Sequence, residues 1–144
     1  MWSDTFLAIE RAHFIRVAVW GAACILVGTL LLALTAVRGA RPPLVRAFAV
    51  QTAVWGIVEV ALALPALRLL RPPDYAAAAR FDHFIWWSLG IDLGAIAVGA
   101  TLALAGWRLG RRLAPVGAGI GIAIHGVALV ALDLVAIAQI GPSM

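Results

Sequence analysis

The stretch Leu113–Ile140 reads LAPVGAGIGIAIHGVALVALDLVAIAQI, and it decides the fold. It is almost wholly apolar, but it contains two ionisable side chains, His125 and Asp133. At a rise of about 1.5 Å per residue, a helix of this length crosses a hydrocarbon core about 30 Å thick. Hydrocarbon offers no hydrogen bonds, so such a helix must turn both groups toward partners on other helices. The stretch therefore predicts a membrane-spanning helix inside a helical bundle.

The composition of the whole chain agrees with a membrane protein. Hydrophobic residues make up 64% of the 144 residues and charged residues 12%, whereas soluble domains average about 45–50% apolar residues. We expect one all-α domain over residues 1–144, an integral membrane four-helix bundle. It should contain a short amphipathic helical lead-in at residues 1–16 and transmembrane helices at about residues 17–37, 47–67, 84–107 and 114–140.

The basic residues are all arginines, eleven in number, and they lie in short clusters between the apolar segments. Arginines in such places anchor helix ends at lipid headgroups, so nucleic-acid binding is not expected in spite of an isoelectric point near 11. Arginine without lysine, together with much alanine and glycine, is typical of a GC-rich bacterial genome. The expected location is therefore a bacterial inner (cytoplasmic) membrane, crossed several times. Six arginines beside the first and third loops, against five on the other side, slightly favour an orientation with both termini outside.

Prolines and one aspartate predict where helices begin and end. The segment Arg38-Gly-Ala-Arg-Pro-Pro should end the first helix, because a proline pair cannot continue it. Pro65 should bend or end the last turn of the second helix. Asp74, which follows two prolines, should cap the N-terminus of the third.

A buried polar layer is predicted from the depth of four side chains. Counted from the nearest arginine at the side of the first and third loops, Glu59, Asp92, His125 and Cys24 lie 13, 16, 13 and 14 residues deep. These counts place the four within about 5 Å of one another in height, near the middle of the bilayer.

Three of these side chains should meet in the bundle interior. Glu59, Asp92 and His125 each share a helix face with small or polar residues, so we expect them within hydrogen-bonding or one-water distance. Asp133 is expected apart from them, in contact with the first or third helix. Gln51, Ser88 and Asp133 make up a secondary polar set.

The polar layer allows two functional interpretations. A bare carboxylate in a medium of low dielectric must become neutral or find a cation, and His125 is the one candidate cation within the predicted spans. The layer could bind a ligand or carry a proton, as expected of a small binding or transport-like protein or an accessory subunit. Alternatively, protonated acids only fix the packing, as expected of a structural or assembly partner in a larger membrane complex. No nucleophile is paired with a base, so an enzyme is less expected.

A metal- or haem-binding protein is the third alternative, and no cofactor is predicted. Haem with two axial histidines needs a facing pair within the membrane, whereas His125 is the one histidine at that depth. Weak metal candidates lie at one interface, where Glu10-Arg-Ala-His13 has the Glu-x-x-His spacing of carboxylate-bridged metal bundles. The candidates there are Glu10, His13, Asp82 and His83.

Glycines spaced four residues apart predict close helix packing. Gly90 and Gly94 form one such pair, and Gly117 and Gly121 form another. Faces of this kind serve packing within a chain or between chains. Besides the lipid bilayer, the expected partner is therefore a second copy in a homodimer, or another membrane protein.

Three of the predicted helices resemble a known family. Ser88-Leu-Gly-Ile-Asp92 followed by Gly99, and the run from Gly119 to Asp133, are similar to an uncharacterised (domain-of-unknown-function) family of small four-helix bacterial membrane proteins. Gln51-Thr-Ala-Val-Trp-Gly is similar to its second helix. The family pattern has Asn where Ser88 stands and Gln where His125 stands. The resemblance implies the four-helix topology and singles out Asp92 and Asp133, and it implies no activity.

Overall fold

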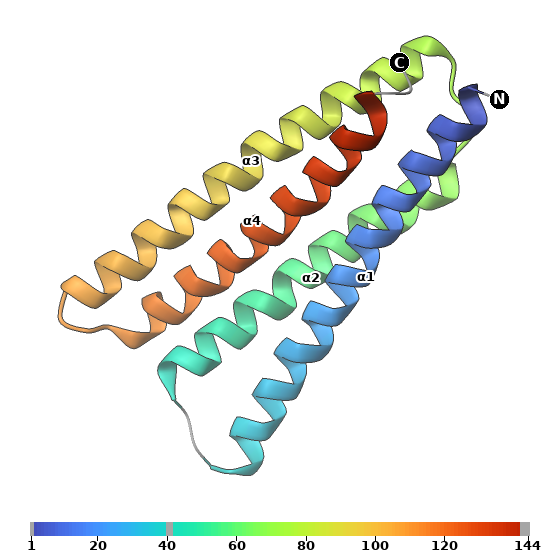
Figure 1. Ribbon diagram of the computed structural model, residues 1–144. Helices are drawn as coiled ribbons and strands as arrows, with labels where there is room; N and C mark the ends of the chain where they lie inside the picture. The colour runs from blue at the N-terminus through green and yellow to red at the C-terminus, as the bar shows by residue number, and fades with distance from the viewer. Residues whose placement is uncertain (1, 40–41, 142–144) are drawn as a thin grey trace.

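The computed structural model describes residues 2–39 and 42–141, and these form four helices joined by short connections. They are α1 (Trp2–Val37), α2 (Pro43–Leu69), α3 (Tyr75–Arg108) and α4 (Leu113–Ile140) (Figure 1). Each is long and apolar enough to cross a membrane. The predicted all-α, four-helix membrane fold is confirmed. Arg41, one of the arginines counted for the orientation, lies outside the described residues.

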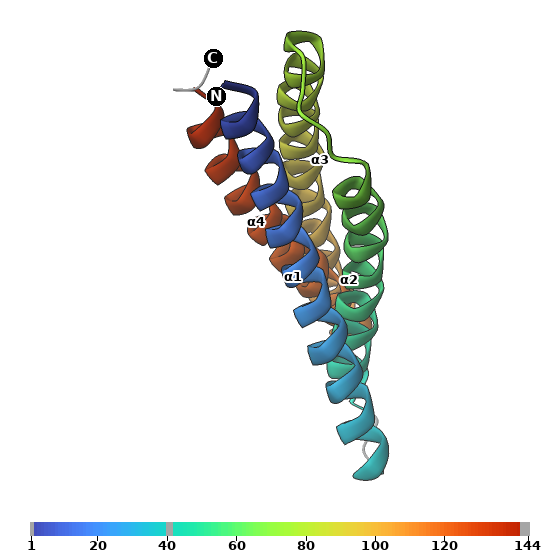
Figure 2. The same ribbon diagram turned by 90° about the vertical axis from the view of Figure 1, so that its right-hand side faces the viewer.

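The helices form two antiparallel hairpins, α1 with α2 and α3 with α4. The hairpins pack together mainly through α2 and α4, with a smaller contact between α1 and α4 (Figures 1 and 2). Over the described residues, α3 is not packed along the length of either α1 or α2. The start of α1, the end of α4 and the α2–α3 connection lie at one end of the bundle, here called the terminal end (Figure 1). The other end carries the α1–α2 and α3–α4 loops.

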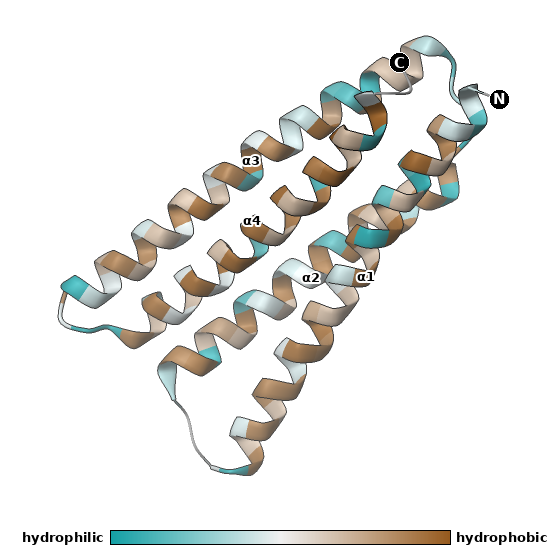
Figure 3. Cartoon of the chain, viewed as in Figure 1, coloured by the Kyte–Doolittle hydropathy of each residue, from teal (hydrophilic) through white to brown (hydrophobic). Residues whose placement is uncertain are grey.

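The outer faces of the helices are apolar and the polar residues gather elsewhere. Hydrophobic residues cover long stretches of every helix, and hydrophilic colours concentrate near the loops and ends (Figure 3). Large aliphatic side chains such as Leu26 and Leu62 are exposed on this surface, at 67% and 70%. Exposed aliphatic faces suit a lipid environment, whereas the buried acids and histidines face the interior.

Two helix ends can be compared with the sequence-based expectation. The helical lead-in at residues 1–16 is the first part of α1, which runs without a break from Trp2 to Val37. Pro65 was expected to bend or end the last turn of α2, and it does not end the helix, which continues to Leu69 with the proline inside it. A proline removes one backbone hydrogen bond, and the turns on either side of it keep theirs.

Asp74 caps α3 as predicted, since its Oδ1 accepts a hydrogen bond of 2.7 Å from the backbone N–H of Ala77. We expect Asp74→Ala to lower the free energy of unfolding by about 1 kcal/mol, the usual cost of losing an N-cap acceptor. Unfolding in mixed detergent micelles, followed by circular dichroism, measures this change. Asp74→Ser keeps a capping oxygen and should retain most of the stability; an equal loss in both variants would contradict the capping role.

Glycines let the two helices of each hairpin approach closely. Between α1 and α2, a Cβ atom added to Gly21 would lie 2.8 Å from the carbonyl oxygen of Gly56, and one on Gly28 would lie 2.6 Å from that of Ala49. Between α3 and α4, one on Gly99 would lie 2.6 Å from the carbonyl oxygen of Gly119. Such distances leave no room for any side chain, so these glycines set the spacing of the helices.

The two predicted glycine pairs behave differently. Gly117 packs against the backbone of Leu44 on α2, and Gly121 lies near Gln51 of the same helix. Gly90 and Gly94 have no neighbouring atom within 4 Å of an added Cβ. The prediction of close packing is therefore wrong for Gly90 and Gly94 within the chain, because the face of α3 that carries them points away from the other helices.

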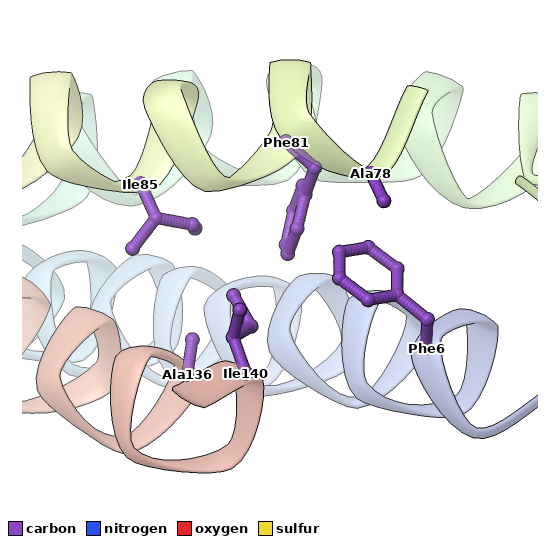
Figure 4. Packing of buried hydrophobic residues seen from close by; sticks show 6 residues of the cluster. All are labelled: Phe6, Ala78, Phe81, Ile85, Ala136 and Ile140. Carbon is purple, nitrogen blue, oxygen red and sulfur yellow. The ribbon is translucent and has the colours of Figure 1, made fainter. Parts of the chain in front are cut away.

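A cluster of buried hydrophobic residues lies near the terminal end of the bundle (Figure 4). Phe6 of α1 is fully buried and meets Phe81 of α3 edge-on, with ring centroids 5.9 Å apart. The cluster joins α1, α3 and α4 and consists of Phe6, Ala78, Phe81, Ile85, Ala136 and Ile140. It therefore ties α3 to α1 at this end.

Candidate functional site

A histidine and a carboxylate meet in the interior between α2 and α4. Nε2 of His125 lies 3.5 Å from Oε1 of Glu59, and both side chains are almost fully buried. Cys24 of α1 completes the group, because one ligating atom from each of Cys24, Glu59 and His125 lies within 4.8 Å of the others. Three helices thus contribute one chemically active side chain each, and we call this set the Cys24–Glu59–His125 cluster.

Glycine contacts bring two members of this cluster together. Gly21 and Gly56 mark the closest approach of α1 and α2, and Cys24 and Glu59 each follow one of these glycines by three residues. A Cβ on Gly21 would lie 3.0 Å from Cβ of Glu59, and one on Gly56 would lie 2.9 Å from Cβ of Cys24. The backbone crossing therefore sets the distance between the thiol and the carboxylate.

The ring of His125 also has contacts on the side that faces away from Glu59. Nδ1 lies 3.2 Å from the carbonyl oxygen of Gly121, one helical turn earlier. When Nδ1 carries the proton, it donates to this carbonyl, and the lone pair of Nε2 faces Glu59. The indole of Trp20 also packs near the imidazole, with ring centroids 5.9 Å apart. The ring orientation is therefore fixed by contacts outside the cluster.

A second polar group lies toward the terminal end. Asp92 of α3 and Asp133 of α4 are joined by a side-chain hydrogen bond, and Ser88 hydrogen-bonds to both. Asp133 also faces His13 of α1, whose Nε2 lies 3.7 Å from Oδ1. We call this set the Asp92–Asp133 group. A hydrogen bond between two carboxyl groups needs a proton on one of them, so at most one carboxyl of this pair is ionised.

The polar residues therefore divide differently from the sequence-based expectation. The structure brings Glu59 to His125, but it pairs Asp92 with Asp133, which was expected to stand apart. Asp133 does contact α3 at Ser88, as expected. The difference comes from the rotation of α3, which turns Asp92 toward Asp133 and Ser88 instead of toward His125.

A cavity of about 480 Å³ extends from Glu59 and the Asp92–Asp133 group to the outer surface. Glu59, Asp92, Asp133 and His13 lie at its buried side, each no more than 6% exposed. Its outer lining comes from exposed apolar residues of α2 and α3, two helices that are not packed along their lengths. These residues are Val58, Leu62, Phe84, Trp87 and Ile91. The cavity therefore opens sideways, toward lipid, between α2 and α3.

Several polar atoms around the cavity have no hydrogen-bond partner. Both carboxylate oxygens of Glu59 are unpartnered, as are one oxygen of Asp92, one of Asp133 and Nδ1 of His13. The indole N–H of Trp55, another lining residue, is also unpartnered. An unsatisfied buried polar group costs about 1–3 kcal/mol, so this concentration of open donors and acceptors indicates that something else satisfies them.

The remaining predicted residues, apart from His13, lie outside both groups. Gln51 is half-buried near Gly121 and lines a shallow surface pocket toward the loop end. Glu10 lines a surface pocket beside Arg80. Asp82 is half-buried, and His83 is exposed at the margin of the cavity. His13 points inward to Asp133. Among the described residues, the three-ligand group that the structure brings together is the Cys24–Glu59–His125 cluster rather than the interfacial set.

Sequence reasoning underrated Cys24 and His13. Cys24 was placed at the correct depth, but a single cysteine gave no motif. His13 was placed at the interface, in the lead-in before the first predicted span. Treating this region as one continuous helix would have placed His13 on the same face as Phe6 and Cys24. The three residues are seven and eleven residues apart, which is about two and three helical turns.

Comparison with known proteins identifies a family for this chain. Neither the curated proteins nor the solved structures contain a match to the chain. A family model, described as a family of unknown function, matches residues 16–134. The matched region begins within α1 and ends just after Asp133, so it includes the Cys24–Glu59–His125 cluster and both aspartates of the second group but not His13. The chain is a four-helix protein of the DUF6992 family.

Proposed function

We propose that the protein binds an amphiphilic small molecule that carries a cationic or hydrogen-bond-donating group. The molecule enters the cavity sideways from the bilayer, in the cytoplasmic membrane of a bacterium. The observation that carries the proposal is the set of open carboxylate oxygens of Glu59, Asp92 and Asp133 at the buried side of a cavity with an otherwise apolar lining.

The lining supports a ligand with two unlike parts. Aromatic and aliphatic side chains, among them Phe14, Trp55 and Trp87, would contact the apolar part. The carboxylates would attract the cationic part, because a charge with no water around it depends on an opposite charge nearby. Small-molecule sites commonly have volumes of about 300–1,000 Å³ and mostly apolar walls with a few polar groups, and a cavity of about 480 Å³ fits this description.

The lateral opening supports access from lipid. The outer lining residues Leu62 and Trp87 are 70% and 75% exposed, on helices that lie apart at this point. A lipophilic cation concentrates in the membrane, so an opening of this kind would meet its ligand there. The same features would serve a transport-like protein or an accessory subunit that presents the molecule to a partner.

Binding of tetraphenylphosphonium to the protein in lipid nanodiscs tests this proposal. We expect Asp92→Asn to weaken binding at least about tenfold, because a unit charge about 4–6 Å away contributes several kcal/mol at an effective dielectric of about 20. Isothermal titration calorimetry measures the affinity, with empty nanodiscs as the blank. Lowering the pH should also weaken binding to the wild-type protein, since protons compete with the cation for the carboxylates.

The matched control is Asp82→Asn, which removes a carboxylate of the same helix that does not line the cavity. It should bind the probe like the wild-type protein. The proposal fails if the wild-type protein binds no more probe than empty nanodiscs, or if both variants bind it equally well.

A further inference from the structure

We propose that the Cys24–Glu59–His125 cluster is a binding site for a divalent transition-metal ion, of which Zn²⁺ is the best-suited example. This site is distinct from the cavity proposed above, because Cys24 and His125 do not line that cavity. Glu59 belongs to both, with one oxygen available to each. The ion would link α1, α2 and α4.

The chemical identity of the three side chains supports the proposal. Thiolate sulfur, imidazole nitrogen and carboxylate oxygen are the ligands found in protein zinc sites. The three come from three different helices, and their ligating atoms lie within 4.8 Å of one another. Two ligands on one tetrahedral Zn²⁺ lie about 3.4–3.6 Å apart, given metal–ligand bonds of about 2.0–2.3 Å. The separation of 3.5 Å between His125 Nε2 and Glu59 Oε1 already has this value.

The unpartnered atoms supply a second, independent observation. Nε2 of His125 and both oxygens of Glu59 have no hydrogen-bond partner, although the two residues are only 3% and 4% exposed. Nε2 of His125 and Oε1 of Glu59, which face each other, would bind the ion. Nδ1 of the same histidine lies against the carbonyl of Gly121, which matches the outer contact that orients metal-binding histidines and leaves the other nitrogen free.

Charge balance selects a divalent ion. A thiolate from Cys24 and a carboxylate from Glu59 carry two negative charges, and neutral His125 adds none. A divalent cation makes the complex neutral, so it can remain in a medium of low dielectric, whereas a monovalent ion would leave a net negative charge. Binding releases the thiol proton, and also the carboxyl proton where Glu59 is protonated. Three protein ligands leave a fourth position for water or another small ligand.

Absorption spectroscopy with Co²⁺ tests the site directly. Co²⁺ takes the place of Zn²⁺ in such sites, and its bond to a thiolate gives a charge-transfer band in the near ultraviolet. Cys24 is the single cysteine of the chain, so a band in the wild-type protein can come from this residue alone. We expect one Co²⁺ per chain after treatment with a chelator and purification in detergent, and loss of the band when Zn²⁺ is added. If the folded wild-type protein gives no such band, the proposal is wrong.

Variants identify the ligands. Cys24→Ser should remove the band, and His125→Gln and Glu59→Gln should each weaken Zn²⁺ binding by more than about 100-fold, beyond the 10–100-fold typical of changes outside the ligand shell. His13→Gln is the matched control, because His13 is an equally buried histidine beside a carboxylate but has no cysteine near it. It should leave the band unchanged.

The outcomes separate this site from the cavity. Asp92→Asn should weaken binding of tetraphenylphosphonium and leave the Co²⁺ band in place, whereas Cys24→Ser should do the reverse. Persistence of the band in folded Cys24→Ser protein, or its loss in folded His13→Gln protein, would overturn the assignment. Size-exclusion chromatography and circular dichroism establish that each variant is folded.

Discussion

Replacing Gly56 by valine is expected to lower the free energy of unfolding by about 3 kcal/mol and to separate Cys24 from Glu59. An added Cβ would lie 2.5 Å from the carbonyl oxygen of Gly21, 2.9 Å from Cβ of Cys24 and 2.9 Å from the backbone nitrogen of Ile25. Two of these three atoms belong to the backbone, so no side-chain rotation relieves the clash and α1 must move away from α2. Overpacking in an interior costs about 1–3 kcal/mol or more, and a branched side chain against backbone belongs at the upper limit.

Two measurements test the effect of Gly56→Val. Unfolding in mixed detergent micelles gives the stability, and the Co²⁺ band gives the state of the Cys24–Glu59–His125 cluster. Gly90→Val is the matched control, because it introduces the same side chain into α3 at a position with no neighbour within 4 Å of the added Cβ. We expect that control to unfold like the wild-type protein. Equal stability of Gly56→Val and Gly90→Val would contradict the role of Gly56 in helix spacing.

The number of helices and their approximate ends were predictable because they follow from local properties of the chain. Four apolar segments separated by arginines and prolines give four membrane-spanning helices whatever their packing. The cap at Asp74 was predictable for the same reason, since capping depends on one oxygen and the next turn. At Pro65 local reasoning left two outcomes open, a bend or a helix end, and the structure excludes the second because α2 continues to Leu69.

The depth of the polar residues was also predictable, but their partners were not. Counting at a fixed rise per residue placed Cys24, Glu59 and His125 at one level, and the structure brings these three within reach of one another. Depth does not fix the rotation of a helix about its axis. Asp92 has a similar depth, yet α3 turns it toward Asp133 and Ser88.

The contacts that fix these rotations are distributed among small residues. Gly126 shows the effect: it directly follows His125, and an added Cβ there would lie 2.7 Å from the carbonyl oxygen of Asp92. The backbone of α4 therefore touches that of α3 beside the polar residues. A glycine that makes this contact and one that faces open space, such as Gly94, look alike in a sequence. The pairing of helix faces was thus not predictable from spacing alone.

The terminal end of the bundle depends on one aromatic residue from a segment that we expected to be peripheral. Phe6 is fully buried between α3 and α4, and its ring meets Phe81 edge-on. Because α3 has little other contact with α1 over the described residues, this cluster fixes the distance between them and hence one side of the cavity. The first turns of α1 therefore belong to the fold.

Phe6→Ala is expected to lower the free energy of unfolding by about 2–3 kcal/mol. Truncating a buried phenylalanine costs about 3–5 kcal/mol in soluble proteins. The expected loss is smaller here because apolar groups gain little by moving from lipid into the protein interior. The loss of packing contacts therefore accounts for most of the change in the free energy of unfolding. Phe84→Ala is the control, since Phe84 lies on α3 beside Phe81 but is 50% exposed. The same detergent unfolding compares the two. Because the cluster links α1 to α3, Phe6→Ala should also weaken tetraphenylphosphonium binding while leaving the Co²⁺ band intact; a loss of the band with unchanged probe binding would contradict this division of the bundle.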